Sequence, residues 1–486
     1  MKPYSEKAPL FEALAAHAAR GGAAFHVPGH KQRAYDEGAS SFYRALLPLD
    51  VTELSDTDDL HHPEGVIAEA QALAAACFGA EETRFLVGGS TAGNLAMILG
   101  MCRPGDLVIL QRNVHKSIIH GLMLAGARAI LLQPEIERLS GLATMPSVEL
   151  LAQALDRYGV EAKAVILSTP NYYGMATRLQ PLIEIAHRTN VPVLVDEAHG
   201  AHFGFHSDLP ESALRSGADL VVQSTHKMLS AMTMGAMLHM QGERLPRGAI
   251  REALTMIQSS SPSYPVMASL DLARREVQAG GEAAFAEALS AVALVVEELE
   301  GTNFRALGYG PYATEGITYD PLKLVLFDAS GRLNGFQLRD ELAERLCLAE
   351  MADDRYVVLA FGTGSTSADG FKLLEALKAL SAPSHVEHSL LHSVPPAIAV
   401  DPNPNVPEPV KFDREIYSSE SIALERSEGR TAAEWVIPYP PGIPVLYPGE
   451  QITVKTIRAL LKWRQEGAKI QGAQDSRLLT IEVRAN

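Results

Sequence analysis

Cysteine is scarce in this chain, and long apolar runs are missing. Cys77, Cys102 and Cys347 are widely separated and show no CxxC spacing, so neither a disulfide framework nor a zinc knuckle is expected, and a reducing compartment fits. No window reaches about 18 uninterrupted apolar residues, the length that a membrane span needs. Residues 1–7 include no apolar segment of the secretory type. We therefore expect a cytoplasmic protein with no membrane association.

Positively charged residues are also fewer than negatively charged ones. The chain has 42 Lys and Arg against 58 Asp and Glu, which gives a net charge of −16. This balance disfavours non-specific nucleic-acid binding, which needs a basic surface. Hydrophobic residues make up 47% and charged residues 21% of the chain, as is typical of a globular protein. A length of 486 residues predicts roughly two to four domains.

Two common ligand motifs are absent as well. HExxH does not occur, and the histidines at 61–62 and at 199, 202 and 206 have no cysteine nearby, so we expect no metal site. The P-loop pattern GxxxxGK[ST] is also missing.

Strand-like runs alternate with helical stretches along the first half of the chain. The runs cover 84–87, 107–110, 129–132, 164–167, 191–195, 220–223 and 235–238, with helical spacing at 94–101, 148–158 and 182–189. This alternation predicts an α/β fold with a mostly parallel sheet, in which ligands bind at the carboxyl ends of the strands.

The rest of the chain divides by composition. Strands at 322–327 and 356–360 around a helix at 335–346 predict a smaller α/β domain. We predict an N-terminal helical segment over 1–30, a large domain over 31–300, the small α/β domain over 301–382, a linker over 383–410 and a C-terminal α+β module over 411–486.

Two charged residues follow predicted buried strands. Asp196 comes directly after the run 191–195, and Lys227 lies a few residues after the run 220–223. A lysine amine can form a Schiff base with the aldehyde of pyridoxal 5'-phosphate (PLP), and a carboxylate can keep its pyridine nitrogen protonated. Each residue alone has a plainer explanation, namely a surface lysine and an aspartate that caps a helix.

Small and polar residues nearby predict an anion site. Ser90 and Thr91 follow a Gly-Gly pair that opens a helix, where backbone N–H groups favour a phosphate. Ser224 and His226 can donate to the same phosphate. The alternative is an ordinary tight turn with a Ser/Thr cap. His115 follows the run 107–110 and could stack on a cofactor ring, or be an ordinary loop residue.

Together these segments resemble the Orn/Lys/Arg decarboxylase family, a fold-type I PLP group. The resemblance runs from about residue 8 to 465 and is closest to the short form without an N-terminal wing domain. Its motifs lie, in order, at residues 25–31, 50–54, 58–65, 89–91, 196–202, 224–227, 260–264 and 438–444.

The resemblance implies roles for individual residues. Lys227, His226 and His115 would be catalytic. The cofactor-binding residues would be Lys227, Asp196, His115, Ser90, Thr91, Ser224, His226, Ala198 and His199. Glu434 would lie in the C-terminal module that closes over the substrate. The loop at 260–261 would reach the neighbouring site of a homodimer or higher oligomer with shared active sites.

The activity implied is PLP-dependent decarboxylation of a basic L-amino acid, with arginine giving agmatine and CO2, in polyamine biosynthesis. Lysine and ornithine are the alternatives as substrates. Another fold-type I enzyme, an aminotransferase or aldolase, is disfavoured by the C-terminal module. A non-catalytic paralogue is disfavoured because Lys227 and Asp196 are intact.

The chain departs from the family pattern around the lysine. Met228, Ser230 and Met234 stand where Thr, Pro and Gln are usual, and Gly88 stands where Asn is frequent. These changes put the substrate preference and rate in question more than the cofactor.

Overall fold

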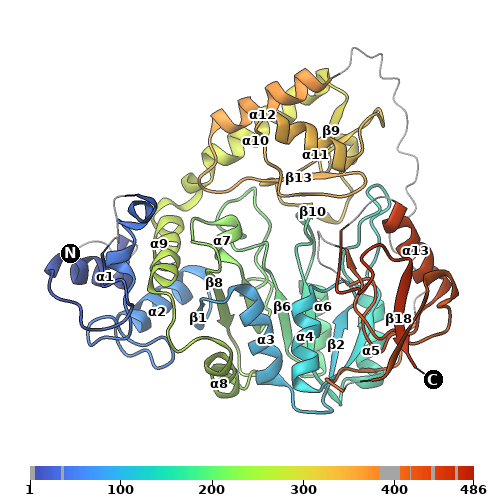
Figure 1. Ribbon diagram of the computed structural model, residues 1–486, viewed down its shortest axis with the longest axis horizontal. Helices are drawn as coiled ribbons and strands as arrows, with labels where there is room; N and C mark the ends of the chain where they lie inside the picture. Colours follow the sequence, from blue (N-terminus) through green and yellow to red (C-terminus); the bar gives the residue numbers. More distant parts are fainter. Residues whose placement is uncertain are drawn as a thin grey trace. The chain divides into compact units, whose positions relative to one another are not determined.

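Helices and strands alternate along most of the chain in the computed structural model, as the sequence predicts (Figure 1). The structure describes residues 6–33, 38–381, 405–415, 417–438, 444–465 and 469–485. Its contacts divide the chain into two compact units. Unit 1 comprises Met1–Met101, Leu194–Ala286 and Gly362–Gly364, and unit 2 comprises Cys102–Val193, Glu287–Phe361 and Ser365–Asn486.

Unit 1 contains hydrogen-bonded strands in the order β1-β8-β7-β6. β6 and β7 run parallel, and β8 is antiparallel to β7 and β1. Asp196 at the end of β6 pairs with Val222 of β7, so both strands end at the same edge. The strands are β1 (Glu82–Leu86), β6 (Val193–Asp196), β7 (Leu220–Gln223) and β8 (Ala236–Met240).

Helices of unit 1 pack closely on these strands. A Cβ at Gly93 would lie 2.7 Å from side-chain atoms of both Leu86 and Val222, so the glycine lets α3 approach the sheet. A Cβ at Gly100 would meet the Ile250 backbone of α8 in the same way. The helices are α1 (Pro9–Arg20), α2 (Val66–Phe78), α3 (Gly89–Met101), α7 (Thr225–Met228), α8 (Arg247–Ile257) and α9 (Tyr264–Gly280), with 3-10 turns at Ala39–Tyr43, Leu47–Leu49 and Gly281–Ala284.

Unit 2 begins with a parallel βα arrangement. β2 pairs in parallel with β3 and β4, and β14 adds to β3 antiparallel. Every residue of β2 is buried, as expected for a strand covered on both faces. The elements are β2 (Leu107–Gln111), α4 (Lys116–Ala125), β3 (Arg128–Leu132), α5 (Val148–Tyr158), β4 (Ala162–Ser168), β5 (Met175–Thr177), α6 (Gln180–Arg188) and β14 (Val410–Lys411).

The predicted small α/β region forms an antiparallel sheet of order β12-β13-β11-β9. The strands β11 and β13 and the helix α11 begin and end within two residues of the sequence predictions, whereas β9 and β12 were not predicted. The elements are α10 (Ala286–Glu298), β9 (Phe304–Ala306), β10 (Ile317–Tyr319), β11 (Lys323–Asp328), α11 (Gly335–Glu344), β12 (Met351–Ala352), β13 (Val357–Ala360) and α12 (Ser367–Leu380), with 3-10 turns at Leu299–Gly301 and Gly310–Tyr312.

The C-terminal segment has its own apolar core around Val436, Leu446, Leu460 and Ile481. It contains β15 (Ser419–Ala423), β16 (Ile437–Pro438), α13 (Val454–Gln465), β17 (Ile470–Gln471) and β18 (Thr480–Arg484), with a 3-10 turn at Leu424–Arg426. The α+β character matches the prediction. Residues 382–404 of the predicted small domain and linker, and 439–443 of the proline-rich motif, lie outside the described residues.

Within the part of the chain that the structure describes, no single helix is long and apolar enough to cross a membrane, although one bent pair, Tyr264–Ala284 with Ala286–Gly301, meets that test by length and composition.

Candidate functional site

Asp196 is held in a fixed orientation at the end of β6. Its side chain is 4% exposed. Oδ1 accepts the backbone N–H of Ala198 at 3.1 Å, and Oδ2 accepts Nδ2 of Asn94 at 2.8 Å. Asn94 lies one turn inside α3 and is 1% exposed. The sequence prediction did not include it, although a polar residue on the buried face of an apolar helix is a signal for such a role.

Lys227 lies in the short helix α7, beyond the end of β7, and contacts His199. The distance from Nζ to Nε2 of His199 is 2.9 Å. A hydrogen bond needs a lone pair on one side, so either the lysine amine or this imidazole nitrogen is unprotonated. Lys227 is half-buried and His199 is buried. The structure therefore brings Lys227 and His199 together, and their role at a cofactor stays a prediction.

The predicted phosphate ligands are available for an anion. Ser90 and Thr91 occupy the first turn of α3, where backbone N–H groups point outward. Among the described residues, the buried hydroxyls of Ser224 and Thr225 have no hydrogen-bond partner. Buried hydroxyls without partners are costly, and a phosphate would satisfy them. The donor set fits PLP.

His226 has one ring nitrogen fixed by the backbone. Its Nδ1 lies 2.9 Å from the carbonyl oxygen of Gly235, and its backbone N–H donates to the same oxygen. Because a carbonyl only accepts, Nδ1 carries a proton. Nε2 is therefore the nitrogen whose protonation state can change.

A buried polar chain lies behind the ends of β6 and β7, and the sequence reasoning missed it. Glu197 accepts Gln223 Nε2 at 2.7 Å, Gln223 Oε1 lies 3.1 Å from His239 Nε2, and His239 Nδ1 lies 2.8 Å from the Thr83 hydroxyl. Burial raises the pKa of Glu197 to about 8 and lowers the pKa of His239 to about 3.

Two predicted site residues belong to unit 2. His115 caps α4, with Nδ1 2.8 Å from the hydroxyl of Ser117. Glu434 is 7% exposed, and its two carboxylate oxygens accept the backbone N–H groups of Gln474 and Glu482 at 2.7 and 2.9 Å. This bonding favours a structural role for Glu434. The ring-stacking role of His115 and the substrate role of Glu434 stay predictions.

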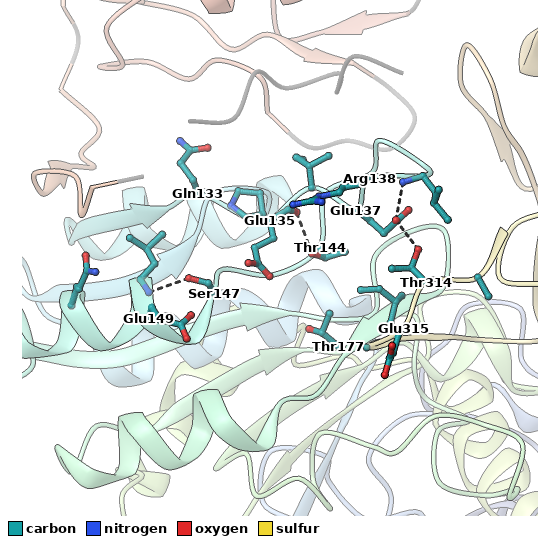
Figure 2. A pocket seen from close by; sticks show the side chains of 18 of the residues that line it. Gln133, Glu135, Glu137, Arg138, Thr144, Ser147, Glu149, Thr177, Thr314 and Glu315 are labelled. Carbon is teal, nitrogen blue, oxygen red and sulfur yellow. Dashed lines mark hydrogen bonds between the residues drawn. The ribbon is translucent and has the colours of Figure 1, made fainter. Parts of the chain in front are cut away.

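A large cavity of about 1210 Å³ lies in unit 2, between the segment after β3 and the β10 region. Figure 2 shows carboxylates and hydroxyls around it, with Glu137 accepting the hydroxyl of Thr314 at 2.7 Å. None of the predicted site residues lines this cavity. In the described residues, no group of three or more His, Cys, Asp or Glu side chains could hold a metal ion.

The departures from the family pattern differ in their surroundings. Met228 is buried at 1%, whereas Met234 is 53% exposed. Ser230 donates to Glu276. Met234 has a φ of +76°, in the left-handed region that non-glycine residues rarely adopt. Its carbonyl accepts the N–H of Gly89 at 2.8 Å, which joins the loop after Lys227 to the first residue of α3.

Comparisons with known proteins agree with this geometry. The family model "Orn/Lys/Arg decarboxylase, major domain" matches residues 8–299, and the C-terminal domain model of the same family matches 404–471. The chain is 40% identical to the uncharacterized protein YaaO of Bacillus subtilis over 96% of each chain. It is 34% identical to the arginine decarboxylase of the same species, over 98% of this chain and 97% of that protein.

Solved structures show the same fold. The lysine decarboxylase LdcF of Francisella novicida matches with a TM-score of 0.80 at 18% identity, over 99% of this chain and 82% of that one. The fold class predicted from the sequence is confirmed.

Proposed function

The chain belongs to the Orn/Lys/Arg decarboxylase family, and from this premise we propose that its substrate is L-arginine, which it converts to agmatine and CO2. It is an amino-acid decarboxylase, and the cofactor of its family is PLP. The choice of arginine is supported by the likeness to the Bacillus subtilis arginine decarboxylase along nearly the whole chain. Lysine and ornithine remain the alternatives.

The cofactor, when bound, supplies an aldehyde for the substrate amine and a protonated ring that withdraws electrons from the substrate α-carbon. Lys227 would hold the aldehyde end. Asp196 would hold the proton on the ring nitrogen, and Asn94 and Ala198 fix the direction of its carboxylate. Because both oxygens of Asp196 are already oriented, little reorganisation is needed when the charge on the ring changes.

Proton transfer at the α-carbon would use groups around Lys227. The hydrogen bond between Lys227 Nζ and His199 Nε2 leaves a lone pair on one of the two atoms. Lys227 can therefore gain or lose a proton without moving far. His226 can donate a proton only from Nε2 in its doubly protonated form, because Nδ1 is bound to the Gly235 carbonyl.

The observation that supports this function best is the arrangement at one edge of unit 1. A lysine with an imidazole partner and an aspartate with two fixed oxygens follow neighbouring parallel strands. Ligands of α/β proteins bind at that edge.

A substrate assay with cofactor-loaded protein tests the proposal. CO2 and amine are measured from arginine, lysine and ornithine, and we expect the highest kcat/KM with arginine. Lys227→Ala should abolish CO2 release, whereas Lys163→Ala, at a half-exposed lysine on β4, should retain it. A higher kcat/KM with lysine or ornithine would contradict arginine as the substrate, but it would still agree with an amino-acid decarboxylase. A keto acid without CO2 would contradict decarboxylation itself.

We also propose a homodimer in which each active site receives the loop at 260–261 of the other copy. Ser260 and Ser261 are exposed, as a loop offered to a partner must be. Mixing two inactive variants, Lys227→Ala and Ser261→Trp, should restore activity if the sites are shared. Activity that stays absent in a mixed dimer of proven composition contradicts this arrangement. The domain boundaries, a cytoplasmic location and a place in polyamine biosynthesis stay predictions.

A further inference from the structure

The buried polar chain of unit 1 connects strands that are far apart in sequence. Glu197 follows β6, Gln223 ends β7, His239 lies in β8 and Thr83 in β1. Each of the four side chains is at most 3% exposed. The carboxyl of Glu197 also accepts the backbone N–H of Ala213 at 2.7 Å. Burial of so many polar groups is costly unless each donor meets an acceptor.

The two N–H donors that point at the Glu197 carboxyl suit its ionised form. Both carboxyl oxygens accept N–H donors, from Ala213 and Gln223. Gln223 Oε1 then accepts from His239 Nε2–H, and His239 Nδ1 accepts the hydroxyl of Thr83. In this state the imidazole proton is on Nε2.

A protonated Glu197 needs the hydrogen bonds along Gln223, His239 and Thr83 to run in the opposite direction. Burial, and to a smaller extent the neighbouring charge of Asp196, raise the pKa of Glu197 to about 8, which favours the neutral acid at pH 7. Its O–H needs an acceptor, and a half-turn of the Gln223 amide supplies Oε1. The amide NH2 then faces His239 Nε2, which must present a lone pair. The imidazole proton therefore moves to Nδ1 and is donated to Thr83.

We propose that Glu197, Gln223 and His239 form a two-state, proton-dependent chain that positions the ends of β6 and β7, with Glu197 as a positioning residue for Asp196. In one state Glu197 is neutral and His239 carries its proton on Nδ1. In the other Glu197 is ionised and the proton is on Nε2. Exchange with solvent supplies and removes the single proton that distinguishes the states.

The chain is coupled to the cofactor through Asp196. The negative charge of Asp196, the residue before Glu197, raises the pKa of Glu197. A protonated ring nitrogen beside Asp196 compensates that charge. Glu197 then releases its proton at lower pH, and by reciprocity an ionised Glu197 strengthens the binding of the protonated ring.

Nitrogen NMR of the imidazole rings tests the inference without any substrate, so the result does not depend on which amino acid is decarboxylated. The protein is labelled with 15N-histidine, and the His239 signal is assigned by its loss in His239→Asn. In the cofactor-free protein, we expect the proton to move from Nδ1 to Nε2 between pH 6 and 10, with a midpoint near the Glu197 pKa of about 8. In the cofactor-loaded protein, the midpoint should shift to lower pH.

Three variants test whether Glu197 controls the position of the His239 proton through Gln223. Glu197→Gln imitates the neutral acid, because its NH2 can donate to Gln223, so His239 should keep its proton on Nδ1 at every pH. Gln223→Met should uncouple His239 from Glu197. Glu137→Gln changes a buried acid of unit 2 whose pKa is lowered by hydrogen bonds, and should leave the His239 titration unchanged.

Stability gives a second measurement. Glu197 has a higher pKa in the folded protein than in the unfolded chain, where it is near 4.5. The folded state therefore binds the extra proton between these values, and wild-type stability falls as pH rises from about 4.5 to about 8. The Tm of Glu197→Gln should rise relative to wild type over that range and then level off.

The proposal is overturned if the His239 proton keeps one position from pH 6 to 10 in wild type, or if the switch persists in Glu197→Gln. It is also overturned if cofactor loading leaves the midpoint unchanged, because the coupling to Asp196 is then absent. If Glu197→Gln fails to fold, the His239 titration of the wild-type protein with and without cofactor is enough to test the proposal.

Discussion

At the scale of single residues, the candidate site depends on side chains that do no chemistry themselves. Asn94 has no reactive group, yet its amide fixes one oxygen of the carboxylate that would hold the cofactor ring. The geometry of Asp196 therefore depends on where α3 lies. A carboxylate free to rotate would lose the orientation that makes it a good partner for a protonated nitrogen.

We expect Asn94→Ala to weaken PLP binding by about ten- to a hundredfold, because a hydrogen bond to a charged group contributes about 1.5–3 kcal/mol. Fluorescence titration of the cofactor-free protein measures this. Asn303→Ala is the matched control, since Asn303 donates to the buried Asp328 at 2.7 Å in the small α/β region. That variant should lose stability and keep its PLP affinity. Equal affinity losses in the two variants would contradict a specific role for Asn94.

The sequence singled out candidate reactive residues but not the side chains that orient them. Asp196 and Lys227 were singled out because each follows a buried strand at the edge where ligands bind, and their roles stay predictions. Asn94 and the Glu197–His239 chain were not found, because their partners lie in other strands. Asn94 and Asp196 are 102 positions apart, and only the packing of α3 on the sheet brings them together.

At the scale of elements, close packing of α3 determines where the first turn with Ser90 and Thr91 lies. We expect Gly93→Ala to destabilise the protein by about 1–3 kcal/mol, because the new Cβ would meet the stiff, β-branched Val222 at 2.7 Å. PLP affinity should fall together with stability, because α3 moves outward.

Gly248→Ala in α8 is the control. Nothing lies within 4 Å of its Cβ, so helix propensity should stabilise it by up to about 1 kcal/mol. The denaturant midpoints of the two variants measure these changes in stability. If both variants were destabilised, or both stabilised, the packing argument would be refuted.

The N-terminal helix α1 is attached to α9 by a buried ion pair. Asp271 and Arg274 are both fully buried and in contact. Asp271 also accepts the N–H of Leu10 at 3.0 Å, and Arg274 donates to the carbonyl of Lys7 at 2.7 Å. The pair therefore satisfies backbone groups at the start of α1 that would otherwise be buried without partners.

Removing one charge of this pair should be costly. We expect Asp271→Asn to lower the free energy of unfolding by about 3–5 kcal/mol, because Arg274 keeps an uncompensated buried charge. Asp340→Asn removes the exposed partner of Arg339 and should cost less than about 1 kcal/mol. Urea denaturation compares them. A similar small loss in both would mean that the buried pair contributes little.

Element boundaries were predictable where the apolar period is strong. The helix expected at 148–158 is α5, Val148–Tyr158, with an apolar face on one side only. The helix α10, Ala286–Glu298, lies between 3-10 turns at Gly281–Ala284 and Leu299–Gly301. Glycine at both ends interrupts the α-helical hydrogen bonds there.

At the scale of the whole molecule, compact units do not follow sequence order. Unit 1 is assembled from three separate segments of chain, which is why no local pattern could predict its contacts. Unit 2 also joins distant segments. Arg112, directly after β2, donates to the carbonyls of Pro444 and Val445 at 2.9 Å and to Glu450 at 3.0 Å. Its guanidinium lies 4.6 Å from the ring centre of Tyr447.

Arg112 therefore attaches the C-terminal segment to the parallel strands of unit 2. Only a planar guanidinium can reach two carbonyls and a carboxylate while stacking on a ring. We expect Arg112→Lys to cost about 2–5 kcal/mol, since Glu450 is largely buried and would lose most of its partner. Hydrogen exchange should rise across residues 444–485.

The matched control is Arg157→Lys. Arg157 also joins distant segments of unit 2, by an exposed pair with Glu408 at 2.6 Å, and exposed pairs contribute little to stability because solvent screens them. Exchange in residues 444–485 should stay at the wild-type rate. A double variant, Arg112→Met with Glu450→Met, should recover part of the stability lost in Arg112→Met, because it leaves no buried charge unpaired. If residues 444–485 of Arg112→Lys are as protected from hydrogen exchange as in wild type, apolar packing around Val436 and Leu446 holds the segment without the arginine.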